Sequence, residues 1–329
     1  MTSTRHAAPR IVFAGCAKDC AAYLPAVFRN IEAMARSASE AAFVFAENDS
    51  ADGTKVLLAQ WCAGRANTRV ITFDGLDAVC PLRSVRRAFL REQFLAAVHD
   101  QFGTYDVFVM LDCDDCNIRP IELAAFSRAI DFLNAEPQLA AVFANQDGLY
   151  FDMWALRHPE LSPGDVWEEV CDYAMALHVS DEEAFQHTLA RRSFRLPPDA
   201  PPLQVQSAFG GLGLYKMTSV RRNAQHYCGC KPKPLMTMWG WKDAGWQCCE
   251  HVAFHRGFVD NGETLFVLPS LINGYTGDTR FVASVFRNYL FDLDGLARLK
   301  SQITDPAALA LFARVFSSPT AELPAGHAF

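Results

Sequence analysis

Short apolar runs alternate with amphipathic stretches through the first half of the chain. The apolar runs at 10–16, 41–46, 68–73, 107–111 and 139–144 have the length and residue types of buried strands. The stretches at 19–36, 52–61, 83–102 and 121–136 have helical spacing of their apolar residues. Strands that alternate with helices predict an α/β fold in which parallel strands are joined by right-handed crossovers.

The apolar run at 107–111 is followed at once by Asp112, Asp114 and Asp115. Ligands of open α/β sheets bind beyond the carboxyl ends of the strands, and two carboxylates there need a cation or a proton to offset their repulsion. Asp112 and Asp114 are two residues apart, so in extended backbone they point to the same side and share one divalent ion. The alternative is a helix N-cap or a solvated turn, where Asp is also favoured.

The second half of the chain is less regular. We expect an acidic helical insertion at 160–203, a last short strand at 266–269, and a terminal helix at 298–316 that breaks before Pro306. Residues 317–329 are expected to form a frayed tail. The predicted division is a first half at 1–115, a second half at 116–280 and a C-terminal segment at 281–329, all within one continuous domain.

Composition narrows the class of protein. The chain has 329 residues, half of them apolar, so it can bury a sizeable core. A net charge of -7, with basic residues scattered outside 83–91, argues against nucleic acid as a partner. No apolar run reaches the roughly 18 residues of a membrane span. Eleven cysteines in a chain of this size indicate reduced thiols and a cytoplasmic location.

The cysteines also raise a rival interpretation. Cys113 and Cys116, together with Cys228 and Cys230 or with the pair at 248–249, supply enough thiolates for a structural zinc. Their spacings fit poorly, because adjacent cysteines and Cys-x-Cys are not the usual zinc knuckles.

Several of these stretches, taken in order, resemble the GT-A class of nucleotide-sugar glycosyltransferases. They are the loop at 14–18 after the first strand, the Glu-Asn-Asp-Ser-x-Asp-Gly-Thr segment at 47–54, the Arg-rich helix at 83–102, the Asp-x-Asp at 112–114, the glycine segment at 207–216 and Cys-Glu-His at 249–251. Phe-Asp-x-Trp-Ala-Leu-Arg at 151–157 makes the chain most similar to the capsule-associated mannosyltransferase-like proteins and their bacterial relatives. The resemblance covers roughly residues 10–275 and implies a GT-A-type, Rossmann-like mixed sheet flanked by helices, with a helical insertion.

The resemblance also implies roles for individual residues. Donor binding falls to Ala14, Cys16, Glu47, Asp49, Arg83, Arg91, Asp112 and Cys113, with Asp115 as an additional contact. Asp112 and Asp114 would hold Mn²⁺ or Mg²⁺, and His251 or His255 would be a later ligand to the metal or the phosphate. Acceptor binding falls to Asp152, Trp154, Gly210 and Gly211. Catalysis falls to Asp114 and to Glu250 as general base.

The implied function is transfer of a sugar from a UDP- or GDP-linked donor to a saccharide acceptor in surface polysaccharide or glycan synthesis. His251 follows Glu250 where the common inverting form has a second acid, so inversion and retention both stay open. Two other functions also stay open: a non-catalytic GT-A-like binding protein, and a nucleotide-sugar hydrolase or nucleotidyltransferase.

Each motif has a structural alternative. The segment at 47–54 is also an ordinary turn, Arg86 and Arg87 fit a solvated helix face, and the glycines fit a tight bend. Tryptophans are more often core than sugar platforms, which applies to Trp154, Trp239, Trp241 and Trp246. A histidine is more often satisfied by hydrogen bonds than bound to metal.

Overall fold

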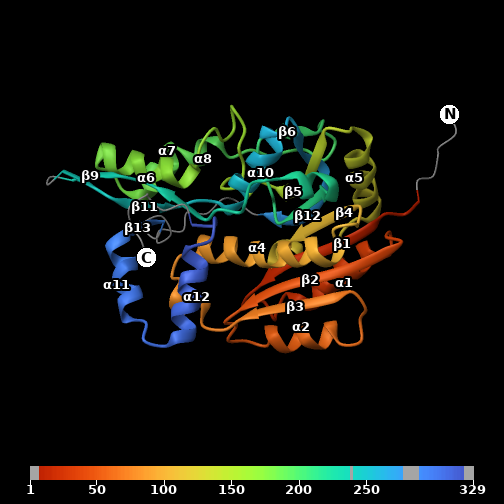
Figure 1. Cartoon of the computed structure of the whole chain (residues 1–329). Helices are drawn as coiled ribbons and strands as arrows, with labels where there is room; N and C mark the ends of the chain where they lie inside the picture. The colour runs from red at the N-terminus through yellow and green to blue at the C-terminus, as the bar shows by residue number, and fades with distance from the viewer. Residues whose placement is uncertain (1–6, 238–239, 277–288, 322–329) are drawn as a thin grey trace.

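The structure, a computed structural model, describes residues 7–237, 240–276 and 289–321. Its centre is an eight-stranded sheet in the order β3-β2-β1-β4-β7-β5-β12-β6 (Figure 1). The strands are β1 (Arg10–Ala17), β2 (Glu40–Asn48), β3 (Thr68–Phe73), β4 (Val107–Leu111), β5 (Leu139–Gly148), β6 (Leu203–Val205), β7 (Leu212–Lys216) and β12 (Thr264–Thr276).

The first four strands are parallel, as predicted, and helices connect them. These helices are α1 (Leu24–Ala35), α2 (Thr54–Cys62), the short α3 (Leu76–Val79) and α4 (Arg83–Phe102). β7 then lies antiparallel between β4 and β5, which makes the sheet mixed. The sequence did not predict β7 as a strand, because its glycine-rich approach is typical of a loop.

Helices cover both faces of the sheet. One apolar cluster packs α1, α2 and α5 (Leu123–Ala135) against alternate residues of the parallel strands, such as Phe13 and Val109. A second cluster packs α4, α10 (Glu250–Asp260) and α12 (Pro306–Phe316) against the opposite face, through residues such as Val12 and Phe108. The predicted α/β class, with a mixed sheet flanked by helices, is therefore confirmed.

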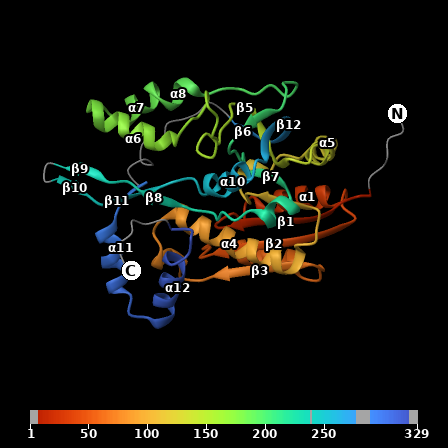
Figure 2. The same ribbon diagram turned by 45° about the horizontal axis from the view of Figure 1, so that its top comes forward.

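The helical insertion is confirmed by α6 (Val166–Leu177), α7 (Asp181–His187) and α8 (Leu189–Arg192), which lie between β5 and β6 in sequence. A small antiparallel sheet follows, made of β8 (Cys230–Pro232), β11 (Ala244–Gln247) and β13 (Leu290–Asp292). The hairpin of β9 (Leu235–Thr237) and β10 (Gly240–Lys242) lies at the end of the molecule away from α5 (Figures 1 and 2). A short helix, α9 (Met217–Arg222), follows β7.

The C-terminal helix breaks where the sequence predicts. α11 (Leu293–Gln302) ends before α12, whose first turn contains Pro306 and whose N-cap Asp305 accepts a hydrogen bond from Ala308 N at 2.8 Å. The predicted tail lies outside the described residues from 322 onwards, as does Trp239. Among the helices that the structure describes, none has the length and apolar character to cross a membrane.

Candidate functional site

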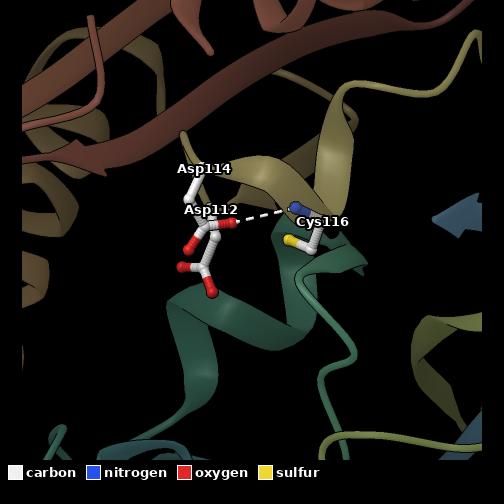
Figure 3. A group of neighbouring side chains, drawn as sticks. All are labelled: Asp112, Asp114 and Cys116. Carbon is white, nitrogen blue, oxygen red and sulfur yellow. Dashed lines mark hydrogen bonds between the residues drawn. The ribbon is translucent and has the colours of Figure 1, made fainter. Parts of the chain in front are cut away.

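The carboxylates after β4 form a compact group with one thiol. Ligand atoms of Asp112, Asp114 and Cys116 all lie within 4.8 Å of one another, and Figure 3 shows the two carboxylates side by side. Asp114 also caps a short 3-10 helix, η1 (Asp115–Asn117), by accepting from Cys116 N at 3.3 Å. Burial, and then the neighbouring charge of Asp112, raise the pKa of Asp114. A cation relieves such repulsion, and carboxylate oxygens suit Mg²⁺ and Mn²⁺, so this donor set fits a divalent metal.

Buried amides hold this acidic loop in place. Asn117 Nδ2 donates to the carbonyls of Asp112 at 2.9 Å and Gly211 at 2.7 Å, and Asn273 Nδ2 donates to Asn117 Oδ1 at 3.0 Å. Gly210 and Gly211 have φ of 64° and 80°, and a Cβ on Gly211 would collide with the Sγ of Cys116. Both positions therefore require glycine to support the loop, and neither lines a cavity of the site.

A first cavity of about 360 Å³ opens where β1 and β4 end beside α4. It is lined by Cys16, Ala17, Lys18, Asp19, Asn48, Arg83, Arg86, Arg87, Leu90, Asp112, Cys113 and Asp114. Four of the expected donor residues are in this set. Ala14 is buried in β1, and Glu47 is buried with its Oε1 accepting from Ser50 N at 2.8 Å. Asp49 accepts from Asp77 N at 2.8 Å, so Glu47 and Asp49 shape the loop behind the cavity.

The arginines of α4 divide into two kinds. Arg86 is paired with Asp77 at 2.9 Å. Arg83 and Arg87, one helical turn apart, line the cavity, and within the described part of the chain neither has an ion pair. The positive charge of Arg87 is the main cause that lowers the pKa of Arg83, to about 10. Two adjacent unpaired guanidiniums beside a cavity form a site for an anion. The solvated-face alternative does not hold for Arg87.

Arg91 is buried and lies between two carboxylates. Its Nη2 is 3.0 Å from Asp112 Oδ1, and its Nη1 donates to Glu250 Oε1. Arg91 and Glu250 are 2% and 1% exposed. Arg91, which is expected to contact the diphosphate, and Glu250, which is expected to be the base, are thus hydrogen-bonded to each other.

A second cavity of about 230 Å³ adjoins the first, because Arg83, Arg87, Asp112 and Asp114 line both. Its other lining residues are Arg91, Asp115, Cys116, Phe151, Asp152, Trp154, Phe209, Cys249, Glu250 and His251. This set includes the expected acceptor residues Asp152 and Trp154. Asp152 Oδ2 accepts from Gly210 N at 2.9 Å, and its Oδ1 accepts from Ala155 N at 3.3 Å. Burial is the main cause that raises the pKa of Asp152.

The two histidines have different surroundings. His251 stacks on Phe209 with ring centroids 4.0 Å apart, and neither of its buried nitrogens has a hydrogen-bond partner among the described residues. Burial, and then Arg91, hold its pKa well below the usual range, so His251 is a neutral imidazole. His255 instead bonds Ser207 Oγ and Tyr215 OH, each at 2.9 Å. His255 is therefore a satisfied core histidine away from both cavities.

The zinc interpretation finds no support in the described residues. There, the metal-ligating side chains that lie together are those of Asp112, Asp114 and Cys116, and no three cysteines have their sulfur atoms within 4.8 Å of one another. Trp246 is fully buried, as its core alternative predicts. Sequence reasoning did not single out Lys18, Asn48 or Phe209, and it left Arg87 open. Arg87 could have been found, since it shares a helix face with Arg83 and Arg91.

No family model matches this sequence, and no curated protein matches it. Solved structures similar to it include enzymes in complex with nucleotides and Mn²⁺. One is a mannosyltransferase from Pyrobaculum calidifontis in complex with GDP-Man and Mn²⁺, at 13% identity and a TM-score of 0.43, covering 94% of this chain and 74% of that one. Another is glucosyl-3-phosphoglycerate synthase from Mycobacterium tuberculosis in complex with Mn²⁺, UDP and phosphoglyceric acid. It is 12% identical with a TM-score of 0.39, and the match covers 98% of this chain and 82% of that one. A third is S. aureus TarS, at 11% identity and a TM-score of 0.41, with a match that covers 94% of this chain and 72% of that one. With TM-scores below 0.5, these likenesses establish neither a family nor an activity for this chain.

Proposed function

We propose that this chain is a metal-dependent glycosyltransferase of the GT-A type that moves a sugar from a nucleoside diphosphate sugar to a saccharide acceptor. The observation that carries the proposal is the meeting of two cavities at one pair of carboxylates and one pair of unpaired arginines. The first cavity takes the nucleoside diphosphate, and the second takes the sugar and the acceptor. The motif at 151–157 supports an acceptor that belongs to a surface polysaccharide.

The residues divide the chemistry between them. Asp112 and Asp114 hold a divalent cation, which supplies Lewis-acid stabilisation of the departing diphosphate. Arg83 and Arg87 donate charge-assisted hydrogen bonds to the phosphate oxygens, and these bonds strengthen as negative charge develops. Arg91 lies 3.0 Å from Asp112 and offsets part of the negative charge that the two aspartates present to the donor. Trp154, which is half-buried in the wall of the second cavity, offers an aromatic surface to a sugar ring.

Nucleotide binding and release test the proposal. Calorimetry with UDP and GDP, with Mn²⁺ or with EDTA, is expected to show binding of one nucleotide that depends on the metal. The same nucleotide should be released from its sugar conjugates in the presence of an acceptor. Asp114→Asn should abolish the metal-dependent part of binding, whereas Asp131→Asn, an exposed change on α5, should leave it intact.

Other outcomes identify the rival functions. Nucleotide binding that is indifferent to Mn²⁺, without release from any donor, would indicate a non-catalytic binding protein. Release that is independent of any acceptor would indicate a hydrolase. Normal metal-dependent binding in Asp114→Asn would remove the carboxylate pair from the mechanism.

A further inference from the structure

We propose that Asp152, on the segment after β5, accepts the proton of the acceptor hydroxyl during transfer. The proposal rests on the glycosyltransferase function proposed above. The acceptor oxygen forms a bond to the anomeric carbon, and the bond from that carbon to the phosphate oxygen breaks with its electron pair leaving on the nucleoside diphosphate. The proton of the acceptor hydroxyl moves to an Oδ atom of Asp152 and passes from there to water.

Glu250, which the sequence singles out as the base, is poorly disposed for this step. Its Oε1 is bonded to Arg91, and both side chains are almost completely buried. A proton taken up by Glu250 would remove one of the two carboxylate charges that compensate the buried Arg91 and would leave Asp112 as its remaining ion-pair partner. Glu250 is better suited to orient Arg91 against Asp112.

Asp152, unlike Glu250, is hydrogen-bonded to backbone amides and not to an arginine. Its two oxygens accept from the backbone amides of Gly210 and Ala155, and within the described residues no cation forms an ion pair with it. Backbone amides fix the direction of the carboxylate and leave lone pairs free on both oxygens, because each carboxylate oxygen accepts more than one hydrogen bond. Asp152 is partly buried and lines the second cavity beside Trp154, where the acceptor is expected.

The other ionisable groups of this cavity have other tasks or too little proton affinity. Asp112 and Asp114 belong to the metal group, and Arg83 and Arg87 are cations. Asp115 is exposed on the 3-10 helix. His251 is neutral, with a pKa well below the usual range, and so is a weak base. The pKa of Asp152 is instead raised by burial, toward the range in which a general base works best.

His251 has a complementary place in this arrangement. In the described part of the chain, both of its nitrogens are buried next to the cavity without a hydrogen-bond partner, and a neutral imidazole donates from one nitrogen and accepts at the other. A sugar hydroxyl supplies both a donor and an acceptor. The second cavity therefore offers a hydroxyl-binding imidazole and a carboxylate that has no ion pair among the described residues.

Chemical rescue at position 152 tests the proposal. The first measurement is the rate of sugar transfer from the donor that wild type uses, with water or one of a panel of methyl glycosides as the acceptor. The second is calorimetry of nucleotide binding in the presence of Mn²⁺. We expect Asp152→Asn to lower kcat by about 10²- to 10⁴-fold with the nucleotide affinity unchanged. Asp152→Ala leaves room for formate in place of the carboxylate, and added formate should restore part of its rate. Asp147→Asn, an exposed change near the end of β5, is the matched control and should behave as wild type.

Glu250→Ala provides the competing arm. Transfer by Asp152→Asn within tenfold of wild type, a loss in Asp152→Ala that formate does not restore, or rescue by formate of Glu250→Ala instead would each overturn the assignment to Asp152. Absence of metal-dependent nucleotide binding in wild type would overturn the proposed function itself, and this proposal with it. The binding measurement thus separates failure of the function from failure of Asp152.

Discussion

Arg91 Nη2 lies 3.0 Å from Asp112 Oδ1, so a buried guanidinium touches one of the two carboxylates that form the candidate metal site. The same guanidinium donates to Glu250, which comes from α10, a helix far away in sequence. The three side chains form a chain from α10 through α4 to the end of β4. The position of the acidic loop is therefore coupled to the packing of two helices.

Replacement of Arg91 by Met should destabilise the fold. The change leaves Glu250 as a buried carboxylate without its partner, and we expect the free energy of unfolding to fall by about 3–5 kcal/mol. Urea denaturation measures this free energy of unfolding. Arg69→Met, at an exposed position of β3, is the control and should change stability by less than about 0.5 kcal/mol. Equal effects of the two changes would show that the buried pair contributes nothing to stability.

Replacement of Arg87 by Met should weaken binding of the diphosphate and spare the nucleoside. Hydrogen bonds to charged groups contribute about 1.5–3 kcal/mol, so we expect about a 10- to 100-fold loss of affinity for UDP or GDP. Affinity for uridine or guanosine should not change. Calorimetry on both ligands separates the two effects, with Arg29→Met on α1 as a control outside both cavities. An equal loss for nucleoside and nucleotide would argue against a phosphate contact.

Replacement of Gly211 by Ala should disturb the acidic loop as well as the backbone. A residue with a side chain at φ 80° costs about 1–3 kcal/mol, and the new Cβ would also displace Cys116. We expect lower stability together with weaker Mn²⁺-dependent nucleotide binding.

Two other glycines supply the controls for Gly211. Gly262→Ala also has a positive φ but meets no atom within 4 Å, so it should lose stability without losing binding. Gly164→Ala has neither feature and should be neutral. If Gly211→Ala binds the nucleotide and Mn²⁺ as wild type does, the support given by Gly211 to the metal site is refuted.

The buried histidines should make stability depend on pH. Burial lowers the pKa of His255 to about 3, below its ordinary value of 6.5, so the unfolded chain binds more protons between these values. Stability is therefore full above about pH 6.5 and falls as the pH decreases, by up to about 1.4 kcal/mol per pH unit for each such group. The pKa of His251 is also lowered by burial, so this residue likewise makes stability fall as the pH decreases.

Unfolding at pH values between about 7 and about 5 measures this dependence. His255→Gln should reduce the slope, because one of the protons taken up on unfolding is removed. His187→Gln, at an exposed position of α7, should leave the slope unchanged. The explanation fails if wild type and His255→Gln lose stability in parallel as the pH falls.

The sequence by itself determined the α/β class and the place of the acidic group. Alternation of buried runs with amphipathic stretches is a local property, and it predicted β1 to β4 and the helices between them. An Asp-x-Asp that directly follows a buried strand must lie at the carboxyl edge of the sheet. For the same local reason, the break before Pro306 could be predicted, since proline cannot continue a helix.

Only the tertiary structure decided which partner each polar side chain meets. Periodicity shows that Arg87 and Arg91 share a helix face, but the pairing of Arg91 with Glu250, 159 residues away, depends on how α4 and α10 pack. Within the residues that the structure describes, that packing leaves Arg87 without an ion pair and both nitrogens of His251 without a hydrogen-bond partner. It places His255 in contact with Ser207 and Tyr215. Local patterns specify which residues are buried, whereas contacts across the sequence depend on the arrangement of whole elements. The roles of Glu250 and Asp152 are distinguished at that level.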